Sequence, residues 1–139
     1  MKVAVFHDYV DCIGGGEKVA LMIARILKAD LITTDVNKDV IDKMGFNDVK
    51  IISLGNTLVK IPPFKQISAS LRFALADFSK DYDLFILSTG WSVFAAKKHK
   101  LNLYYCHSPV RPFFDLYEVF KKRQNIIQKP FFILWVYLH

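Results

Sequence analysis

The sequence has few cysteines and lacks a long apolar run. Among its 139 residues there are two cysteines, Cys12 and Cys106, which are too few and too far apart for a disulfide framework or a cysteine metal site. The longest unbroken apolar run, Phe131–Leu138, is far shorter than the ~20 residues that cross a bilayer. The first residues show no signal-peptide pattern. These absences predict reduced thiols and a cytoplasmic location.

The motifs of several enzyme classes are also missing. The sequence contains neither the G-x-S-x-G of serine hydrolases nor the H-E-x-x-H of zinc proteases. The glycine triplet Gly14–Gly16 fits neither G-x-G-x-x-G nor the phosphate loop that ends in lysine and serine or threonine. We therefore expect no serine nucleophile and no bound metal.

Composition indicates one folded domain that favours anionic partners. Hydrophobic residues make up 53% and aromatic residues 14% of the chain, which argues against disorder. Nineteen basic against thirteen acidic residues give a net charge of +6, which favours phosphorylated ligands or an acidic membrane surface. The basic runs are short and are not interleaved with aromatics, so no nucleic-acid partner is expected.

The opening of the chain has the pattern of a βαβ unit. A short apolar run, Val3–Phe6, is followed by a turn that ends in Gly14–Gly16, and apolar residues then recur at helical spacing to Leu27. The free N–H groups at the start of such a helix attract an anion. Two interpretations stay open: an anion site, or a tight turn without a ligand. Glu17 favours the helix start electrostatically, but it would also repel an anion that came too close.

Strand-like and helix-like segments alternate along the rest of the chain. This alternation predicts an α/β fold, a Rossmann-like three-layer α/β/α sandwich with a mainly parallel sheet. The predicted strands are Lys2–Phe6, Leu31–Thr34, Val49–Ile52, Leu84–Leu87 and Leu101–Cys106. The predicted helices are Gly16–Lys28, Asp35–Lys43, Phe64–Phe78, Trp91–Lys98, Phe113–Gln124 and a last apolar helix from Pro130.

Polar residues follow several predicted strands, where ligands of parallel sheets gather. His7 beside Asp8 suggests a base with its orienting carboxylate, but adjacent strand residues point to opposite faces, which favours a structural role. His107 either donates to a substrate hydroxyl or phosphate, or is a satisfied, partly buried histidine. Arg111 either clamps an anion or pairs with Asp115.

Three segments resemble a known enzyme family. Ile13–Val19 resembles the I-G-G-A-E-R-hydrophobic signature of family 4 glycosyltransferases, a retaining family with the GT-B fold. Tyr104–Pro112, with the downstream Asp115, resembles that family's Y-x-C-H-(S/T)-P-x-R segment. Asp83–Gly90 is similar to the strand that ends in its Ser/Gly-rich loop. The chain departs from the signature with glycine at position 16 and lysine at position 18.

The resemblance implies one half of a GT-B architecture. Residues 1–139 would be the N-terminal, acceptor-side domain, and the nucleotide-sugar domain would lie outside this chain, in cis or in trans. The complete enzyme would transfer a sugar from a nucleotide-sugar to an acceptor hydroxyl with retention, in cell-envelope polysaccharide, glycolipid or glycoprotein synthesis. The acceptor in this family is often lipid-linked, and no resident cofactor is implied.

The resemblance also assigns roles to individual residues. His107 would contact the transferred sugar as the catalytic residue, and the glycine loop would approach the donor phosphates or sugar. Helix dipoles and basic side chains would hold the departing diphosphate without a metal. The donor-binding positions are Gly14, Gly15 and Gly16, and the cleft-lining positions are Asp8, Ser88, Thr89, Ser108 and Arg111.

The apolar segment from Pro130 leads to two competing hypotheses. A helix that is apolar on all sides is usually buried or partnered. The first hypothesis is the N-terminal half of an enzyme, inactive alone. The second is a non-catalytic binding module, or one subunit of a split enzyme, that docks a partner or the inner membrane face through this segment. In the membrane case, the basic residues of 121–123 and Lys129 would meet acidic lipids. A third interpretation, an unrelated nucleotide-binding α/β protein, requires the His107 segment to match by coincidence.

Overall fold

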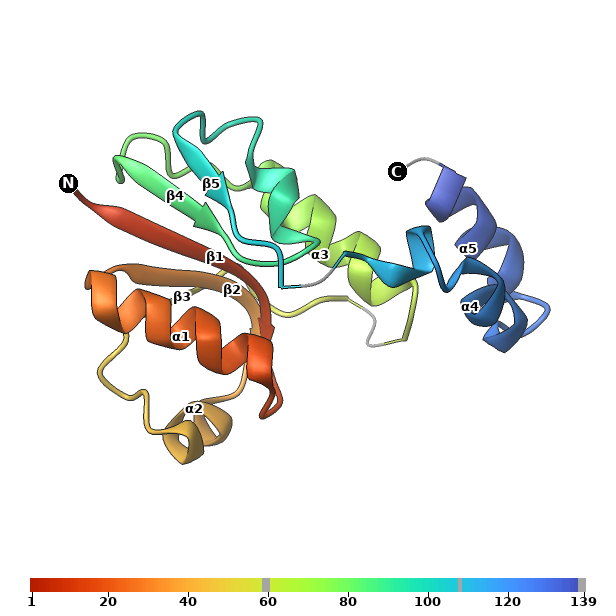
Figure 1. Ribbon diagram of the computed structural model, residues 1–139, viewed down its shortest axis with the longest axis horizontal. Helices are drawn as coiled ribbons and strands as arrows, with labels where there is room; N and C mark the ends of the chain where they lie inside the picture. The colour runs from red at the N-terminus through yellow and green to blue at the C-terminus, as the bar shows by residue number, and fades with distance from the viewer. Residues whose placement is uncertain (59–60, 108, 138–139) are drawn as a thin grey trace.

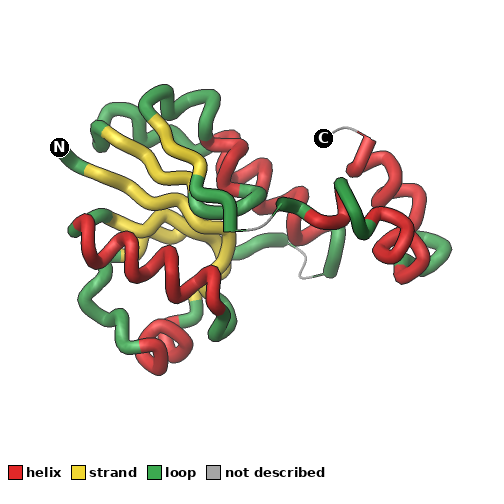
Figure 2. The backbone as a smooth tube through the Cα atoms, in the orientation of Figure 1, coloured by secondary structure: helices red, strands yellow, loops and turns green. Residues whose placement is uncertain are grey.

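A five-stranded parallel sheet with helices on both faces forms the body of the molecule (Figures 1 and 2). The computed structural model describes residues 1–58, 61–107 and 109–137. The predicted fold class, a Rossmann-like α/β sandwich, is confirmed. The strands are β1 Val3–Val10, β2 Asp30–Val36, β3 Ile51–Ser53, β4 Leu84–Leu87 and β5 Asn102–Tyr104. The helices are α1 Gly15–Leu27, α2 Lys38–Met44, α3 Phe64–Leu75, α4 Tyr117–Arg123 and α5 Gln128–Tyr137, with the 3₁₀ turns η1 Ser92–Ala95 and η2 Arg111–Phe113.

The strand order β3-β2-β1-β4-β5 places β1 at the centre of the sheet. Val5 of β1 lies opposite Leu31 of β2 on one side and Ile86 of β4 on the other. The chain runs outward from β1 through β2 to β3, and then returns to the other side of β1 with β4 and β5. The order in which strands are added therefore reverses between β1 and β4, and this junction is the switch point of the sheet.

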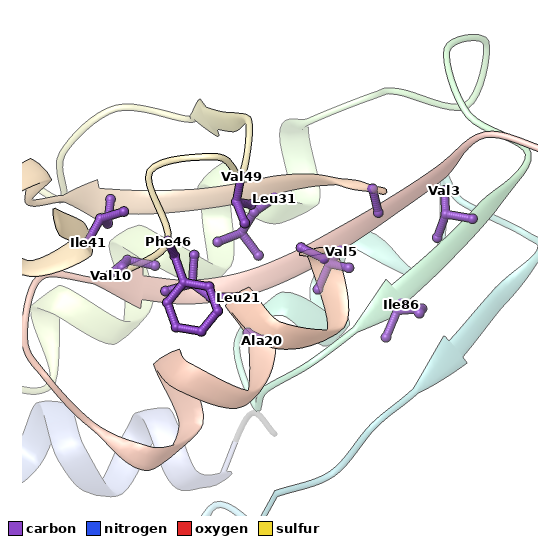
Figure 3. Packing of buried hydrophobic residues seen from close by; sticks show 12 residues of the cluster. Val3, Val5, Val10, Ala20, Leu21, Leu31, Ile41, Phe46, Val49 and Ile86 are labelled. Atoms are coloured by element: carbon purple, nitrogen blue, oxygen red, sulfur yellow. The ribbon is translucent and has the colours of Figure 1, made fainter. Parts of the chain in front are cut away.

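One face of the sheet is covered by α1 (Figure 3). The helix places Ala20, Leu21 and Ala24 against the strands, and Leu21 packs in the same fully buried cluster as Val5 and Leu31. Burial of a side chain the size of Leu21, Val5 or Leu31 stabilises the fold by roughly 1.5–3 kcal/mol. This core fixes the position of the start of α1 relative to the end of β1.

The other face is covered by α3 and η1, and α5 lies beyond them, away from the sheet (Figure 1). Phe6 of β1 and Phe73 of α3 are both fully buried, and their rings meet edge to face with centroids 6.0 Å apart. Helix α3 is shorter than the sequence predicts: it ends at Leu75, whereas the predicted helix ends at Phe78. Leu71 and Leu75 of this helix are exposed.

Helix α5 is partly buried against the residues around Trp91 and Phe113. Phe132 and Trp135 are buried, and the Trp135 ring lies 5.0 Å from that of Trp91 and 4.9 Å from that of Phe113, between centroids. Phe131 and Leu134 of the same helix are about half exposed. Among the helices that the structure describes, none is long and apolar enough to cross a membrane.

Several predicted boundaries are wrong at the ends of strands. We expected β1 to end at Phe6, but it pairs with β2 as far as Val10, with irregular register after His7. Its polar residues, His7 and Asp8, are buried in the strand rather than placed in a turn. Similarly, β2 continues to Val36, so α2 begins at Lys38, where the Asn37 side chain accepts a hydrogen bond from the Val40 N–H.

Two predicted helices are also shorter than expected. The segment Trp91–Lys98 forms only the 3₁₀ turn η1. The segment Phe113–Gln124 is divided into η2 and α4, because Pro112 sits in a 3₁₀ turn that precedes the helix. These changes leave a loop-rich surface at the carboxyl ends of β4 and β5.

Candidate functional site

The candidate site lies at the carboxyl ends of β1 and β4, the switch point of the sheet. Open α/β sheets bind ligands in the crevice at this position. The loop from β1 to α1, the loop after β4 and the segment after β5 all meet there. The site residues that the sequence predicts come from these three segments.

The glycine loop leads directly into α1. Gly14 is extended at φ −139° and ψ 168°, and within the part of the chain that the structure describes no side chain caps the N–H groups of the first turn. A Cβ at Gly14 would clash with the carboxylate of Glu17, whereas a Cβ at Gly15 would meet none of the described atoms within 4 Å. Open space therefore lies beside the uncapped helix start, and the Glu17 carboxylate forms one wall of it.

His7 is buried behind this helix start. It is only 2% exposed, and its Nδ1 is a buried atom without a hydrogen-bond partner among the described residues. A Cβ at Gly16 would lie 3.8 Å from the His7 Cε1, and the rings of His7 and His107 are 6.2 Å apart in an edge-to-face arrangement. Burial lowers the pKa of His7 to about 4, with a smaller contribution from the nearby His107. At neutral pH this imidazole is therefore uncharged.

His107 is held by Ser88. Its Nε2 is hydrogen-bonded to the Ser88 Oγ at 2.9 Å, and the Tyr105 ring lies edge-on at 4.9 Å between centroids. Ser88 is fully buried, and its own N–H donates to the Phe6 carbonyl of β1. A rigid serine thus orients a solvent-exposed imidazole at the switch point.

Asp8 ties β1 to the loop after β4. Its carboxylate accepts hydrogen bonds from the N–H groups of Trp91, at 3.1 Å, and Ser92, at 2.7 Å, and so caps η1. Its own N–H donates to the Thr89 Oγ1 at 3.0 Å. Burial raises the pKa of Asp8 to about 6, against the lowering effect of these hydrogen bonds. Asp8 bonds to this loop rather than to His7, as strand alternation predicts.

Arg111 adopts the simpler of its two predicted roles in this structure. Its guanidinium forms a two-pronged ion pair with the Asp115 carboxylate, and both side chains are about half exposed. The pair raises the pKa of Arg111 and lowers that of Asp115. The predicted cleft residue Ser108 lies outside the described residues.

A mainly apolar hollow opens beside Cys106, the residue that precedes His107 in the chain. Its volume is about 440 Å³, and it lies between the loop after β4 and the segment after β5. Gly90 is part of its wall, and a Cβ there would lie only 2.5 Å from Cγ2 of Val110. Trp91, Tyr104, Cys106 and Phe113 complete most of the lining.

The structure brings most of the predicted residues to one place. A continuous series of neighbours runs from Ser88 through His107 and His7 to Gly16. Next to this series, the Asp8 N–H donates a hydrogen bond to the Thr89 hydroxyl. His7 is the functional candidate that the sequence did not select. Its signal in the sequence is a histidine near the end of the central strand, for which strand alternation favours a structural role.

Comparison of this chain with models of known protein families, with curated proteins and with solved structures finds no match. The described residues also contain no cluster of three or more His, Cys, Asp or Glu side chains suited to a metal ion.

Proposed function

We propose that this chain is the acceptor-side domain of a retaining glycosyltransferase that uses a nucleotide-sugar donor. A second Rossmann-like domain, in cis or in trans, would close over the switch-point crevice and hold most of the donor. The observation that carries the proposal is the series Ser88–His107–His7–Gly16 at that crevice. It joins two segments that resemble glycosyltransferase motifs and lie about 90 residues apart, a separation of roughly a domain's length.

The chemistry of these groups suits a sugar phosphate. The uncapped N–H groups at the start of α1 favour the diphosphate of the donor. Neutral imidazole both donates and accepts hydrogen bonds, as sugar hydroxyls require, and burial keeps His7 in this form. The Glu17 carboxylate repels phosphate but accepts a hydrogen bond from a hydroxyl. We therefore place a sugar ring next to Glu17 and Gly14, with the phosphates toward Gly15.

The acceptor is assigned to the apolar hollow beside His107. Its aromatic lining, with Trp91 and Phe113, suits the apolar part of an acceptor. An acceptor hydroxyl at the edge of this hollow would lie near the His107 imidazole, where the sugar is transferred. A lipid-linked acceptor satisfies this arrangement, because it carries both an apolar group and hydroxyls.

Binding can be tested with the isotope-labelled chain by NMR. Titration with UDP-glucose, GDP-mannose or UDP should shift the amide signals of Gly15, Gly16 and Thr89, while the signals of α2 stay unchanged. Sodium sulfate at equal ionic strength serves as the control anion. Ser88→Ala should weaken binding by roughly fivefold to tenfold, because about 1 kcal/mol of hydrogen bonding to His107 is lost. The matched control, Ser79→Ala, removes an exposed serine whose hydroxyl donates to the Asp77 carboxylate.

Catalysis is tested on the protein purified from its own cells together with its second domain. His107→Ala should lower the transfer rate by roughly 10²–10³, as expected when one preorganised polar group is removed. NMR of the new anomeric centre should show retention. An inverted product would contradict the proposal. If none of the nucleotides shifts the glycine-loop signals and the protein with its second domain transfers no sugar, the alternative of a non-catalytic binding module is favoured instead.

A further inference from the structure

The turn between α4 and α5 projects two large apolar side chains into solvent. Ile126 is 91% exposed and Ile127 is 76% exposed. Figure 2 shows this loop at the end of the molecule that lies farthest from the sheet. A single exposed apolar residue is ordinary, but two adjacent ones at a projecting tip indicate a contact surface.

An apolar stripe continues from the tip along α5. Phe131 and Leu134 are three residues apart and share one side of α5, and Ile127, in the turn just before the helix, precedes Phe131 by four residues. Phe131 and Leu134 are about half exposed. They also line a nearly wholly apolar groove of about 250 Å³ between α3 and α5. The exposed apolar surface is therefore continuous from the turn to the body of the molecule.

Uncompensated positive charge flanks the tip. Segment 117–137 contains four basic residues and one acidic residue, Glu118, which gives a net charge of +3. Among the described residues, Glu118 pairs with Lys121, whereas Lys122, Arg123 and Lys129 form no ion pair. Arg123 precedes Ile126 by three residues, and Lys129 follows Ile127 by two. The free positive charges thus lie immediately on both sides of the apolar tip.

We propose that the α4–α5 turn docks the protein onto an anionic lipid bilayer. Ile126 and Ile127 enter the interfacial region, while Lys122, Arg123 and Lys129 meet the lipid phosphates. A second copy of the chain fits this surface poorly, because two turns of net charge +3 would repel each other. The proposal extends beyond glycosyl transfer and does not depend on it, since it involves a surface away from the glycine loop.

The test is co-sedimentation of the whole chain with lipid vesicles. We expect binding to vesicles of equal parts phosphatidylcholine and phosphatidylglycerol, and little binding to pure phosphatidylcholine. The triple variant Lys122→Ala/Arg123→Ala/Lys129→Ala should lower the partition coefficient by on the order of a hundredfold, because each basic residue contributes about fivefold. Ile126→Ser/Ile127→Ser should lower it by at least about tenfold, because apolar burial is lost. Added salt should weaken binding of the unaltered chain.

Matched controls remove the same chemistry elsewhere on the surface. Lys97→Ala/Lys98→Ala/Lys100→Ala deletes three exposed lysines near η1, and Ile26→Ser deletes an exposed isoleucine of α1. Both should bind vesicles like the unaltered chain. All variants change exposed side chains, so their circular dichroism should stay the same.

Three outcomes would overturn the proposal. The first is equal binding to neutral and anionic vesicles, and the second is equal loss in the control variants. The third is the absence of vesicle binding together with self-association that Ile126→Ser/Ile127→Ser abolishes in sedimentation velocity, which would identify a second copy as the occupant. None of these outcomes bears on nucleotide binding, so the proposed glycosyltransferase function is tested separately.

Discussion

His7 and Asp8 are adjacent buried ionisable residues whose pKa values move in opposite directions. Burial lowers the pKa of His7 to about 4 from 6.5 and raises that of Asp8 to about 6 from 3.8. In both cases burial disfavours the charged form. Each shift corresponds to about 3 kcal/mol of pH-dependent stability.

The two shifts predict pH dependences of opposite sign. As pH falls from 6.5 to 4, His7 gains a proton only in the unfolded chain, so the free energy of unfolding falls. As pH rises from 3.8 to 6, Asp8 loses its proton first in the unfolded chain, so the free energy of unfolding falls in that direction. The effects should nearly cancel in the unaltered protein.

Single substitutions should reveal each dependence. In His7→Gln, stability should fall by about 3 kcal/mol as pH rises through this window, and in Asp8→Asn it should rise by about the same amount. Urea denaturation in steps of pH measures both slopes. Slopes of the same sign in the two variants would show that these residues do not set the pH dependence.

The cap that Asp8 provides to η1 gives a second prediction at the residue scale. Its Oδ1 accepts from both the Trp91 and Ser92 N–H groups. Asp8→Ala leaves these buried donors unsatisfied and should cost about 1–3 kcal/mol at neutral pH. Asp8→Asn keeps an equivalent oxygen and should cost clearly less. Asp77→Ala, which removes an exposed carboxylate, is the surface control. Equal losses in the two Asp8 variants would contradict the cap.

At the scale of elements, the loop after β4 and the segment after β5 are held together through Gly90. A Cβ at this position would lie 2.5 Å from Val110 Cγ2, so Gly90→Ala should destabilise the protein by about 1–3 kcal/mol. Adding Val110→Ala should recover part of that loss, with a coupling energy of roughly 0.5–3 kcal/mol. Additive effects in the denaturation experiments would mean that the two segments do not touch.

Helix α5 offers a direct test of its two predicted roles. Trp135 packs against Trp91 and Phe113, so Trp135→Ala should cost about 3–5 kcal/mol. Leu134→Ala, on the exposed side of the same helix, should change stability by less than about 0.5 kcal/mol. If both substitutions are tolerated, α5 is a docking segment and not part of the core.

The sequence predicts an element well where the residues of that element alone determine its structure, and poorly where distant residues determine it. The continuous apolar run Leu84–Leu87 predicts a buried strand, and the structure confirms it. The extension of β1 through His7 to Val10 was missed, because polar residues are rare in buried strands. The 3₁₀ turn η1 was also missed, because its cap comes from Asp8, more than 80 residues away.

For the whole molecule, sequence reasoning located the rim of the site but not its internal contacts. Alternating strands and helices place Ser88, His107 and the glycine loop at one edge of the sheet, which the topology confirms. The contact between His7 and His107 depends on which strands are neighbours in the sheet, and this order is not encoded in local periodicity. The sequence also predicts an apolar last helix, but it does not show which side of that helix packs against the rest of the molecule.

The distribution of buried residues predicts a gradient of local stability across the molecule. Seven of the eight residues of β1 are buried, whereas α4, which is described in full, contributes none and α5 contributes Phe132 and Trp135. Native-state hydrogen exchange should therefore show slowest exchange in β1 and its neighbours, with α4 opening at much lower free energy. Local opening of α4 and α5 would let the α4–α5 turn adapt to a membrane surface while the switch-point residues keep their geometry. If α4 amides exchange as slowly as those of β1, the chain unfolds as a single unit, and the turn must dock as a rigid body.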